Sequence, residues 1–285
     1  RWILSRLAGV VADAGRQLET FRFHEYAKTI HEFAWGDFCD WYVELAKPVL
    51  GGGGDAAKST ARVLAWVLDN IMRLLHPAAP FFTEEVWHLM AGVVPSRGLE
   101  SAAPAAPMLV RAPWPDAEAY AAWRDEAVER DMSRAMDVIR AIRNIRAKFN
   151  LPPKSTLNVS VSAADEEYAA SLSPLTDIIT SQAGLDTLEI GVNLPKPQQA
   201  AAEVMPGAQV YAPLAELMNV EVEKKRIEKE LANKSGALNT LNLKLHNHDF
   251  LLKAPADVVE KEKARRAELT RQIKELTELR ESLSS

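Results

Sequence analysis

Two ladders of regularly spaced apolar positions run through the C-terminal part of the sequence. Each ladder advances by three or four residues at a time without a slip, which is the heptad pattern of helices that pack along one seam. The first ladder consists of Leu217, Val220, Lys224, Ile227, Leu231, Lys234, Leu238, Leu241 and Leu245, and the second of Val259, Glu262, Arg266, Leu269, Ile273, Leu276, Arg280 and Leu283. The pattern predicts two long helices that share one seam.

A short break marked by a proline separates the two ladders. Residues 246–250 are mostly polar, and Pro255 follows within residues 253–257. Proline removes a helical hydrogen-bond donor, so the first helix is expected to end before it. Two helices joined by a short break fold back as an antiparallel hairpin. At 1.5 Å per residue, an arm of about thirty residues reaches roughly 45 Å. Such an arm is too thin to hold a pocket, so we expect it to contact a large partner.

Residues 1–150 show helical periodicity almost throughout. The apolar spacing predicts a helix over 1–20 and a second, rich in aromatic residues, over 23–45, closed by Pro48 and followed by a flexible turn at glycines 51–54. Three further helices are expected over 57–75, 80–90 and 116–149, with a long irregular connection between the last two. Five helices with short to medium links predict an up-and-down bundle.

The character of the sequence changes after residue 150. Residues 156–162 alternate apolar and polar side chains, as a half-buried strand does. Further strands are expected over 185–190 and 209–214, helices over 166–172 and 175–183, and a loop rich in Pro, Gln and Ala over 194–202. We therefore predict a mainly α protein with a helical-bundle domain over 1–150, a small α+β module over 151–213 and an antiparallel coiled-coil arm over 214–285.

Composition places the chain among ordinary soluble globular proteins. Of its 285 residues, 47% are hydrophobic and 26% charged, and the formal net charge is −5. Residues 217–285 hold 14 Lys and Arg against 12 Asp and Glu, a small excess of positive charge. The single cysteine, Cys39, excludes an internal disulfide and a cysteine-based zinc cluster, and its aromatic neighbours suggest a buried, inert thiol. No apolar run approaches the ~18 residues that span a membrane.

Little in the sequence resembles a catalytic centre. It has no P-loop and no GxGxxG motif, and its histidines lack metal-ligand spacing. His246 and His248, two residues apart, point to different faces of a helix. Glu84 and Glu85 are best explained as first-turn acids favoured by a helix dipole. We therefore expect no catalytic residue, no metal site and no cofactor in this chain.

Basic residues concentrate in the last helix of the predicted bundle. Arg140, Arg143 and Lys148 flank its apolar stripe, and Arg146 lies near the edge of that stripe. Two interpretations remain open. In one, these side chains form a solvated helix face whose stems cover the rim of the core. In the other, they contact the phosphate backbone of a nucleic acid, for which the fork of arginine is well shaped.

Several motifs resemble those of the valyl-tRNA synthetase family. Residues 33–47, FAWGDFCDWYVELAK, are similar to a run in the anticodon-binding helical domain of that family. Residues 75–87, LHPAAPFFTEEVW, resemble a run shared by the valyl, leucyl, isoleucyl and methionyl enzymes. Further matches lie at Trp114-Pro115, at residues 142–146 with prolines 152 and 153, and at residues 253–262, which resemble the turn of the C-terminal arm. The single cysteine argues against the isoleucyl branch, which carries a cysteine zinc module.

The resemblance implies the C-terminal part of a class I aminoacyl-tRNA synthetase, cut after the first helix of the bundle. The bundle would read the anticodon stem-loop of tRNA(Val), and the arm would pack against the outer corner of the L-shaped tRNA. The motifs of the catalytic and editing domains are missing from this sequence. ATP and Mg would therefore belong to the longer enzyme, and the chain should be inactive alone. The resemblance also implies a monomeric, cytoplasmic protein that does not bind a membrane.

Cations near the tip of the arm are the candidate tRNA contacts, namely Lys244, Lys253, Lys261 and Arg265. Arg266 falls on the seam, where its stem is expected to pack. The alternative is a protein-interaction module whose hairpin pairs with a partner coiled coil and binds no RNA. The apolar residues 250–252 near the turn would serve that alternative, or would pack on a tRNA loop.

Overall fold

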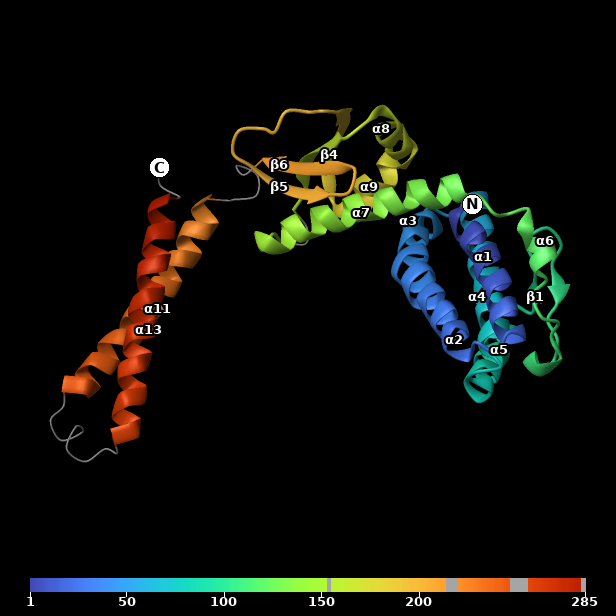
Figure 1. Cartoon of the computed structure of the whole chain (residues 1–285), viewed down its shortest axis with the longest axis horizontal. Coiled ribbons are helices and arrows are strands. Elements are labelled where there is room, and N and C mark those ends of the chain that lie inside the picture. The colour runs from blue at the N-terminus through green and yellow to red at the C-terminus, as the bar shows by residue number, and fades with distance from the viewer. Residues whose placement is uncertain (153–154, 214–219, 247–255, 283–285) are drawn as a thin grey trace.

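The computed structural model describes residues 1–152, 155–213, 220–246 and 256–282. Figure 1 shows three parts in chain order: a helical bundle, a small sheet with its helices, and a pair of long helices at the end opposite the bundle. Helices dominate all but the middle part. The predicted class, mainly α with a small α+β module and an antiparallel two-helix arm, is therefore confirmed.

The bundle consists of helices that each bury a stripe of apolar side chains. In α1, Ile3, Leu7, Val11 and Ala14 are buried, at the spacing that one face of a helix requires. The helical elements are α1 (Trp2–Glu19), α2 (Phe23–His31), η1 (Glu32–Val43), α3 (Glu44–Gly52), α4 (Gly54–Leu75), α5 (Pro80–Val93), η2 (Leu109–Arg111), α6 (Ala117–Ala121) and α7 (Glu126–Lys148). The short strands β1 (Ser96–Arg97) and β2 (Ala103–Pro104) pair antiparallel.

The helical run from α2 to α3 contains an unusual middle segment. η1 is a π-helix of 12 residues, a conformation found mostly as single turns and often at functional sites. The prediction that Pro48 closes this run is wrong, because α3 continues to Gly52. Pro48 has no N–H to donate to the carbonyl of Glu44, four residues earlier. Both residues are exposed, so water can donate to that carbonyl instead. The run ends instead at Gly53, whose φ of +70° suits glycine.

The single helix predicted over 116–149 is divided into two helices. α6 ends at Ala121, and α7 begins only after Asp125. The carboxylate of Asp125 accepts a hydrogen bond from the N–H of Val128 at 3.1 Å and so caps the new helix. The N–H of Asp125 donates to Oγ of Ser5 at 2.8 Å. The first helix of the chain therefore fixes the point at which α7 starts.

The middle part is a four-stranded mixed sheet in the order β4-β3-β6-β5. β3 pairs in parallel with β4 and antiparallel with β6, and β5 pairs antiparallel with β6. The elements are β3 (Leu157–Ala163), α8 (Glu166–Leu172), η3 (Ser173–Leu175), α9 (Thr176–Ala183), β4 (Leu185–Val192), β5 (Ala200–Met205) and β6 (Ala208–Pro213). Three predicted strands and both helices are found. The loop predicted over 194–202 is partly wrong, because β5 begins within it.

The apolar face of α7 belongs to the core of the sheet. Ile139, Ile142 and Ile145 are buried in one cluster with Val159 and Val161 of β3. The remaining bundle helices form a separate cluster around α1, α4 and α5. Figure 1 shows α7 running from the top of the bundle to a position alongside the sheet. The helix thus joins the two parts, and the division of the chain at residues 150 and 213 stays a prediction.

The arm consists of α11 (Val220–His246) and α13 (Ala256–Ser282), each of 27 residues. On α11, Leu241 and Leu245 are buried and Leu231, Lys234 and Leu238 are partly buried, as the first ladder predicts. On α13, the partly buried ladder residues are Val259, Glu262, Leu269, Ile273 and Leu276. Arg266, between the ladder residues Glu262 and Leu269, is exposed, so its stem is not packed as expected. The ladder positions before residue 228 and after residue 277 lie outside the described side chains.

Candidate nucleic-acid interface

Two of the predicted cations on α7 lie over a buried tryptophan of the bundle. The guanidinium carbons of Arg140 and Arg143 are 5.2 and 5.5 Å from the ring of Trp41, and both side chains remain exposed. Arg140 donates to Asp137 at 2.8 Å, and Arg143 donates to the carbonyl of Gln182 at 3.1 Å. Each guanidinium has five N–H donors, so each keeps donors that can meet a phosphate.

Arg146 is held differently, because its guanidinium is used within the chain. It donates to the carbonyls of Ser155 at 2.8 Å, Pro152 at 2.9 Å and Gly184 at 3.4 Å. Gly184 ends α9 in the left-handed region, at φ +67°, where glycine is favoured. Arg146 therefore links the end of α7 to the segment that precedes β3 and to the turn between α9 and β4. These bonds compete with any contact to RNA.

Lys148 forms an ion pair with β5. Its Nζ lies 2.6 Å from Oε2 of Glu203. That hydrogen bond, followed by the charge of Lys148, lowers the pKa of the Glu203 carboxyl below its usual range. Lys148 is 61% exposed, so the pair lies at the surface, where such pairs contribute little stability.

The predicted arm cations fall into three groups. Lys244 on α11 donates to Oε1 of Glu262 on α13 at 2.6 Å, and this bond lowers the pKa of Glu262. Lys261 and Arg265 are exposed on α13, and Arg265 also contributes to the lowered pKa of Glu262. Lys253 lies outside the described residues. The structure therefore brings Lys244 and Arg265 to one carboxylate, that of Glu262, and Lys261 lies one turn before Arg265 on the same helix.

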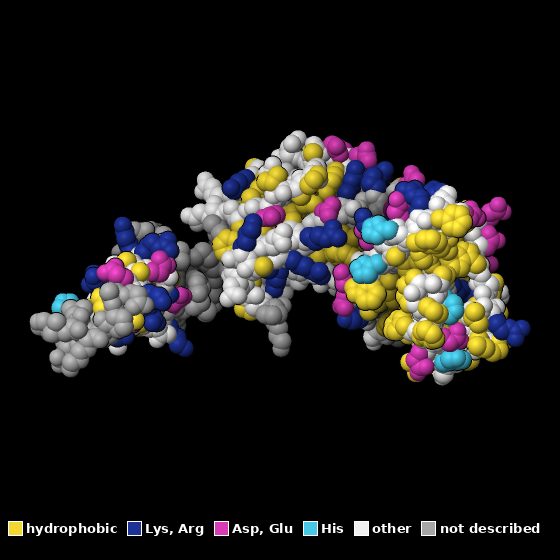
Figure 2. Space-filling view, turned by 60° about the horizontal axis from the view of Figure 1, so that its bottom comes forward, with side chains coloured by type: hydrophobic (Ala, Val, Ile, Leu, Met, Phe, Trp, Pro, Cys, Tyr) yellow, Lys and Arg dark blue, Asp and Glu magenta, His cyan; other side chains and the backbone are white. Residues whose placement is uncertain are grey.

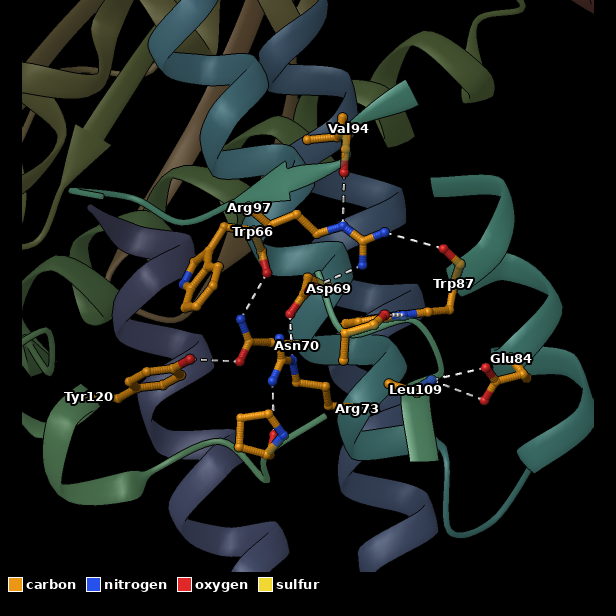
Figure 3. A network of polar contacts seen from close by, with 12 residues as sticks. Trp66, Asp69, Asn70, Arg73, Glu84, Trp87, Val94, Arg97, Leu109 and Tyr120 are labelled. Carbon is orange, nitrogen blue, oxygen red and sulfur yellow. Dashed lines mark hydrogen bonds and ion pairs between the residues drawn. The ribbon is translucent and has the colours of Figure 1, made fainter. Parts of the chain in front are cut away.

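A buried ionic network in the bundle was not predicted from the sequence (Figure 3). Asp69 on α4 is fully buried, and its carboxylate accepts from Nε of Arg73 at 2.6 Å and from Nη1 of Arg97 at 3.0 Å. Arg97 also donates to the carbonyls of Val94 and Trp87 at 3.1 and 3.2 Å. Both guanidinium groups lie over the ring of Trp87, at 4.1 Å for Arg97 and 5.2 Å for Arg73.

The same network fastens the irregular connection between α5 and α6 to the bundle. Arg73 donates to the carbonyl of Pro113 at 2.9 Å. Tyr120 donates to Asn70 at 2.8 Å, and burial raises the pKa of Tyr120 to about 12, so its hydroxyl stays protonated. Glu84, interpreted above as a first-turn acid, instead accepts from the N–H of Leu109 at 2.9 Å. The network therefore has a structural role, and nothing in the spacing of these residues predicts it.

Exposed aromatic side chains are a second feature that the sequence did not single out. Figure 2 shows hydrophobic side chains over much of the bundle surface and Lys and Arg side chains over the middle part and the arm. Trp35 is 58% exposed, and its ring stacks on that of His31. Cys39, predicted to be buried, is exposed. Desolvation by neighbouring atoms, followed by the charge of Asp40, raises the pKa of the Cys39 thiol.

Two further properties of the described residues bear on function. No group of three or more His, Cys, Asp or Glu side chains among them is arranged to hold a metal ion. None of the helices they form is both long and apolar enough to cross a bilayer.

Comparisons with known proteins cover both ends of the chain. Residues 1–161 match the family model described as the anticodon-binding domain of tRNA ligase, and residues 219–284 match the valyl tRNA synthetase tRNA binding arm. The chain is 40% identical over 271 residues to a valine–tRNA ligase of Geobacter sulfurreducens, which covers 95% of this chain and 29% of that protein.

Two other relatives give the same result. The valine–tRNA ligase of Geobacillus stearothermophilus is 40% identical over 266 residues, which are 93% of this chain and 29% of that protein. The valine–tRNA ligase of Syntrophotalea carbinolica is 36% identical over 286 residues, which cover all of this chain and 30% of that protein. The chain thus spans less than a third of the length of these relatives.

Proposed function

This chain belongs to the valyl-tRNA synthetase family, and from that premise we propose that it binds tRNA(Val) at two places. Its bundle contacts the anticodon stem-loop, and its arm contacts the elbow where the D- and T-loops meet. One observation carries the proposal: a single chain holds both the anticodon-binding domain and the tRNA-binding arm of this family. RNA is recognised largely by shape, phosphate and 2′-OH contacts, together with stacking on unpaired bases.

In the bundle, Arg140 and Arg143 support the proposal best. Both are exposed, and both are held over Trp41, so little side-chain freedom is lost when they bind a phosphate. Arg146 and Lys148 are committed to contacts with the sheet module. Their role at the RNA stays a prediction, and a phosphate would have to compete with those contacts.

In the arm, Lys261 and Arg265 support the proposal best. They lie one helical turn apart on α13 and are exposed. Lys244 reaches the same end from α11 but shares its charge with Glu262. A small group of cations on a thin rigid hairpin suits contact with one or a few phosphates of a large RNA.

The remaining predictions concern the longer enzyme and the cell. ATP and Mg would act in a catalytic domain that the present sequence does not contain, so the isolated chain should not activate valine. The test is valine-dependent pyrophosphate exchange with the pure chain. A monomer is favoured because the two arm helices bury their seam against each other. A cytoplasmic location fits a protein with one free thiol.

The proposal is tested by binding three RNAs to the purified chain: full-length tRNA(Val), its isolated anticodon stem-loop, and a control tRNA of another amino acid. We expect tRNA(Val) to bind most tightly and the stem-loop to keep part of that affinity. Absence of binding to tRNA(Val) would refute the proposal. It would leave the alternative of a hairpin that pairs with a protein partner.

The arm contact has its own test. Arg265→Ala should weaken binding of full-length tRNA by about 1 kcal/mol, the scale of a partly exposed charge-assisted contact, and lower the salt slope by about 1. The stem-loop should bind the variant as it binds the wild type. Arg271→Ala is the matched control, since Arg271 is exposed on the same helix and pairs with Glu268 further from the tip. Equal weakening of the stem-loop would contradict the elbow contact.

A further inference from the structure

The pair His31 and Trp35 forms a flat aromatic surface on the bundle. The two ring planes differ by 5° and their centroids are 5.2 Å apart. His31 ends α2, and Trp35 lies one turn further on in the π-helix η1. The tryptophan side chain is 58% exposed, although tryptophan is usually highly buried. A large ring held at the surface by a parallel neighbour is a ready surface for a third ring.

The position of this surface relates it to the cations of α7. Trp41, over whose ring Arg140 and Arg143 lie, follows Trp35 by six residues in the same π-helix. With a rise of at most 1.5 Å per residue, the two tryptophans are separated by roughly 9 Å or less along the helix axis. Trp35 is exposed and Trp41 is buried, so the two tryptophans of η1 face different surroundings, the first open to a ligand and the second covered by Arg140 and Arg143.

We infer that Trp35, backed by His31, is a stacking platform for an unpaired base of the anticodon loop. This inference rests on the proposed function and adds a binding element to it. Loops expose bases that stack on aromatic side chains, and such stacking tolerates any base. The platform therefore supplies affinity for the loop and does not identify the base.

Other exposed aromatic residues fit this role less well. Phe21 and Phe23 meet edge to face, with an angle of 75° between their rings, so they present no common plane to a base. Phe81 is 91% exposed at the start of α5, but among the described residues no second ring stacks behind it. Trp41 itself is 7% exposed and cannot receive a base.

The test combines stem-loop affinity with a fluorescent base. Each unpaired position of the anticodon loop is replaced in turn by 2-aminopurine, whose emission is quenched when it stacks. The variants are Trp35→Ala, Trp35→Phe and, as a matched control, Trp114→Ala, whose side chain is 40% exposed in another segment. Circular dichroism checks that each variant keeps its helices.

We expect Trp35→Ala to weaken stem-loop binding about fivefold to a hundredfold, the range for loss of one base–aromatic stack. One labelled position should lose its quenching, Trp35→Phe should restore part of both signals, and Trp114→Ala should change neither. If the wild-type chain binds the stem-loop and Trp35→Ala binds it equally well, the platform is overturned but the proposed function is not. The same holds if Trp114→Ala weakens stem-loop binding as much as Trp35→Ala does. Failure of the wild-type chain to bind any tRNA(Val) species would overturn the proposed function and the platform with it.

Discussion

Lys244 of α11 donates from Nζ to Oε1 of Glu262 on α13 at 2.6 Å. Glu262 occupies a seam position of the second ladder, and its side chain is 17% exposed. The lysine is 44% exposed, so the pair joins the surface of one helix to the seam of the other. A polar contact of this kind at a hairpin seam favours one register of the two helices over others.

The first prediction concerns the pKa of Glu262. Its folded-state value is lowered, first by the hydrogen bond from Lys244, so the pair contributes stability above the unfolded value of about 4.3 and loses it as the pH falls through the folded value. Lys244→Gln should move the pKa of Glu262 back towards its ordinary value. A carboxyl NMR titration measures this. An unchanged pKa in the variant would mean that the contact does not persist in solution.

The second prediction concerns the buried network in Figure 3. Arg97 is 2% exposed, and Arg97→Met would leave Asp69 with Arg73 as its remaining partner. Removing one partner of a buried ion pair typically costs about 3–5 kcal/mol, and the second arginine should hold the loss near the lower end. Urea unfolding followed by tryptophan fluorescence measures it. Arg62→Met, which removes an exposed arginine of α4, is the control and should cost far less.

Local patterns were sufficient for most helices and strands but failed where a distant residue decides the structure. The restart of α7 after Asp125 depends on Ser5, which lies 120 residues away in sequence. No window over 116–149 contains that contact. The helix continues through Pro48 because the carbonyl that loses its donor is exposed to water, and a local sequence window does not show which residues will be exposed.

The missed strand β5 did have a local signal. Pro206 and Gly207 form a two-residue turn between β5 and β6, with Gly207 at φ +79°, the conformation that a type II turn requires. A side chain at Gly207 would also meet the ring of Tyr168 at 2.7 Å. The Pro206-Gly207 dipeptide is a turn signal, and a strand that ends at this turn would be predicted on its N-terminal side, where β5 lies.

The candidate site was only partly predictable for a similar reason. The sequence located the cations on α7. It could not show whether each side chain contacts RNA or another part of the chain, because the position on the helix is the same in both cases. Arg146 reaches the carbonyls of Pro152 and Ser155 because α7 and the sheet share a core. The exposure of Trp35 depends on packing, so periodicity alone could not separate it from Trp41, which is buried in the same run.

The third prediction tests the structural role of Arg146. Arg146→Lys keeps the positive charge but cannot bond several carbonyls at once, so it should destabilise the sheet module by about 1–2 kcal/mol. The salt slope of tRNA binding should stay unchanged, because the number of cations is the same. Hydrogen exchange in β4 and thermal unfolding report the first effect. Arg140→Lys, at an exposed position, is the control, and equal destabilisation by it would argue against the clamp.

The last prediction uses two leucines of α11 that differ in exposure. Leu241 is 7% exposed on the seam, whereas Leu243 is 75% exposed on the outer surface of the same helix. Leu241→Asp removes a buried apolar side chain, worth about 2 kcal/mol, and places a carboxylate against the other helix. Leu243→Asp has the same cost in helix propensity without the loss of burial. The comparison therefore isolates seam packing.

Because a two-helix hairpin has little other support, Leu241→Asp should unfold the arm while the bundle and sheet keep their unfolding temperature. Circular dichroism should show loss of helix from the arm, and limited proteolysis should cut within α11 and α13. Leu243→Asp should retain wild-type helicity and protease resistance. Full-length tRNA(Val) should bind the Leu241 variant more weakly while the anticodon stem-loop binds it normally, since the stem-loop needs only the bundle. Intact helicity in Leu241→Asp would show that the seam does not run through this residue.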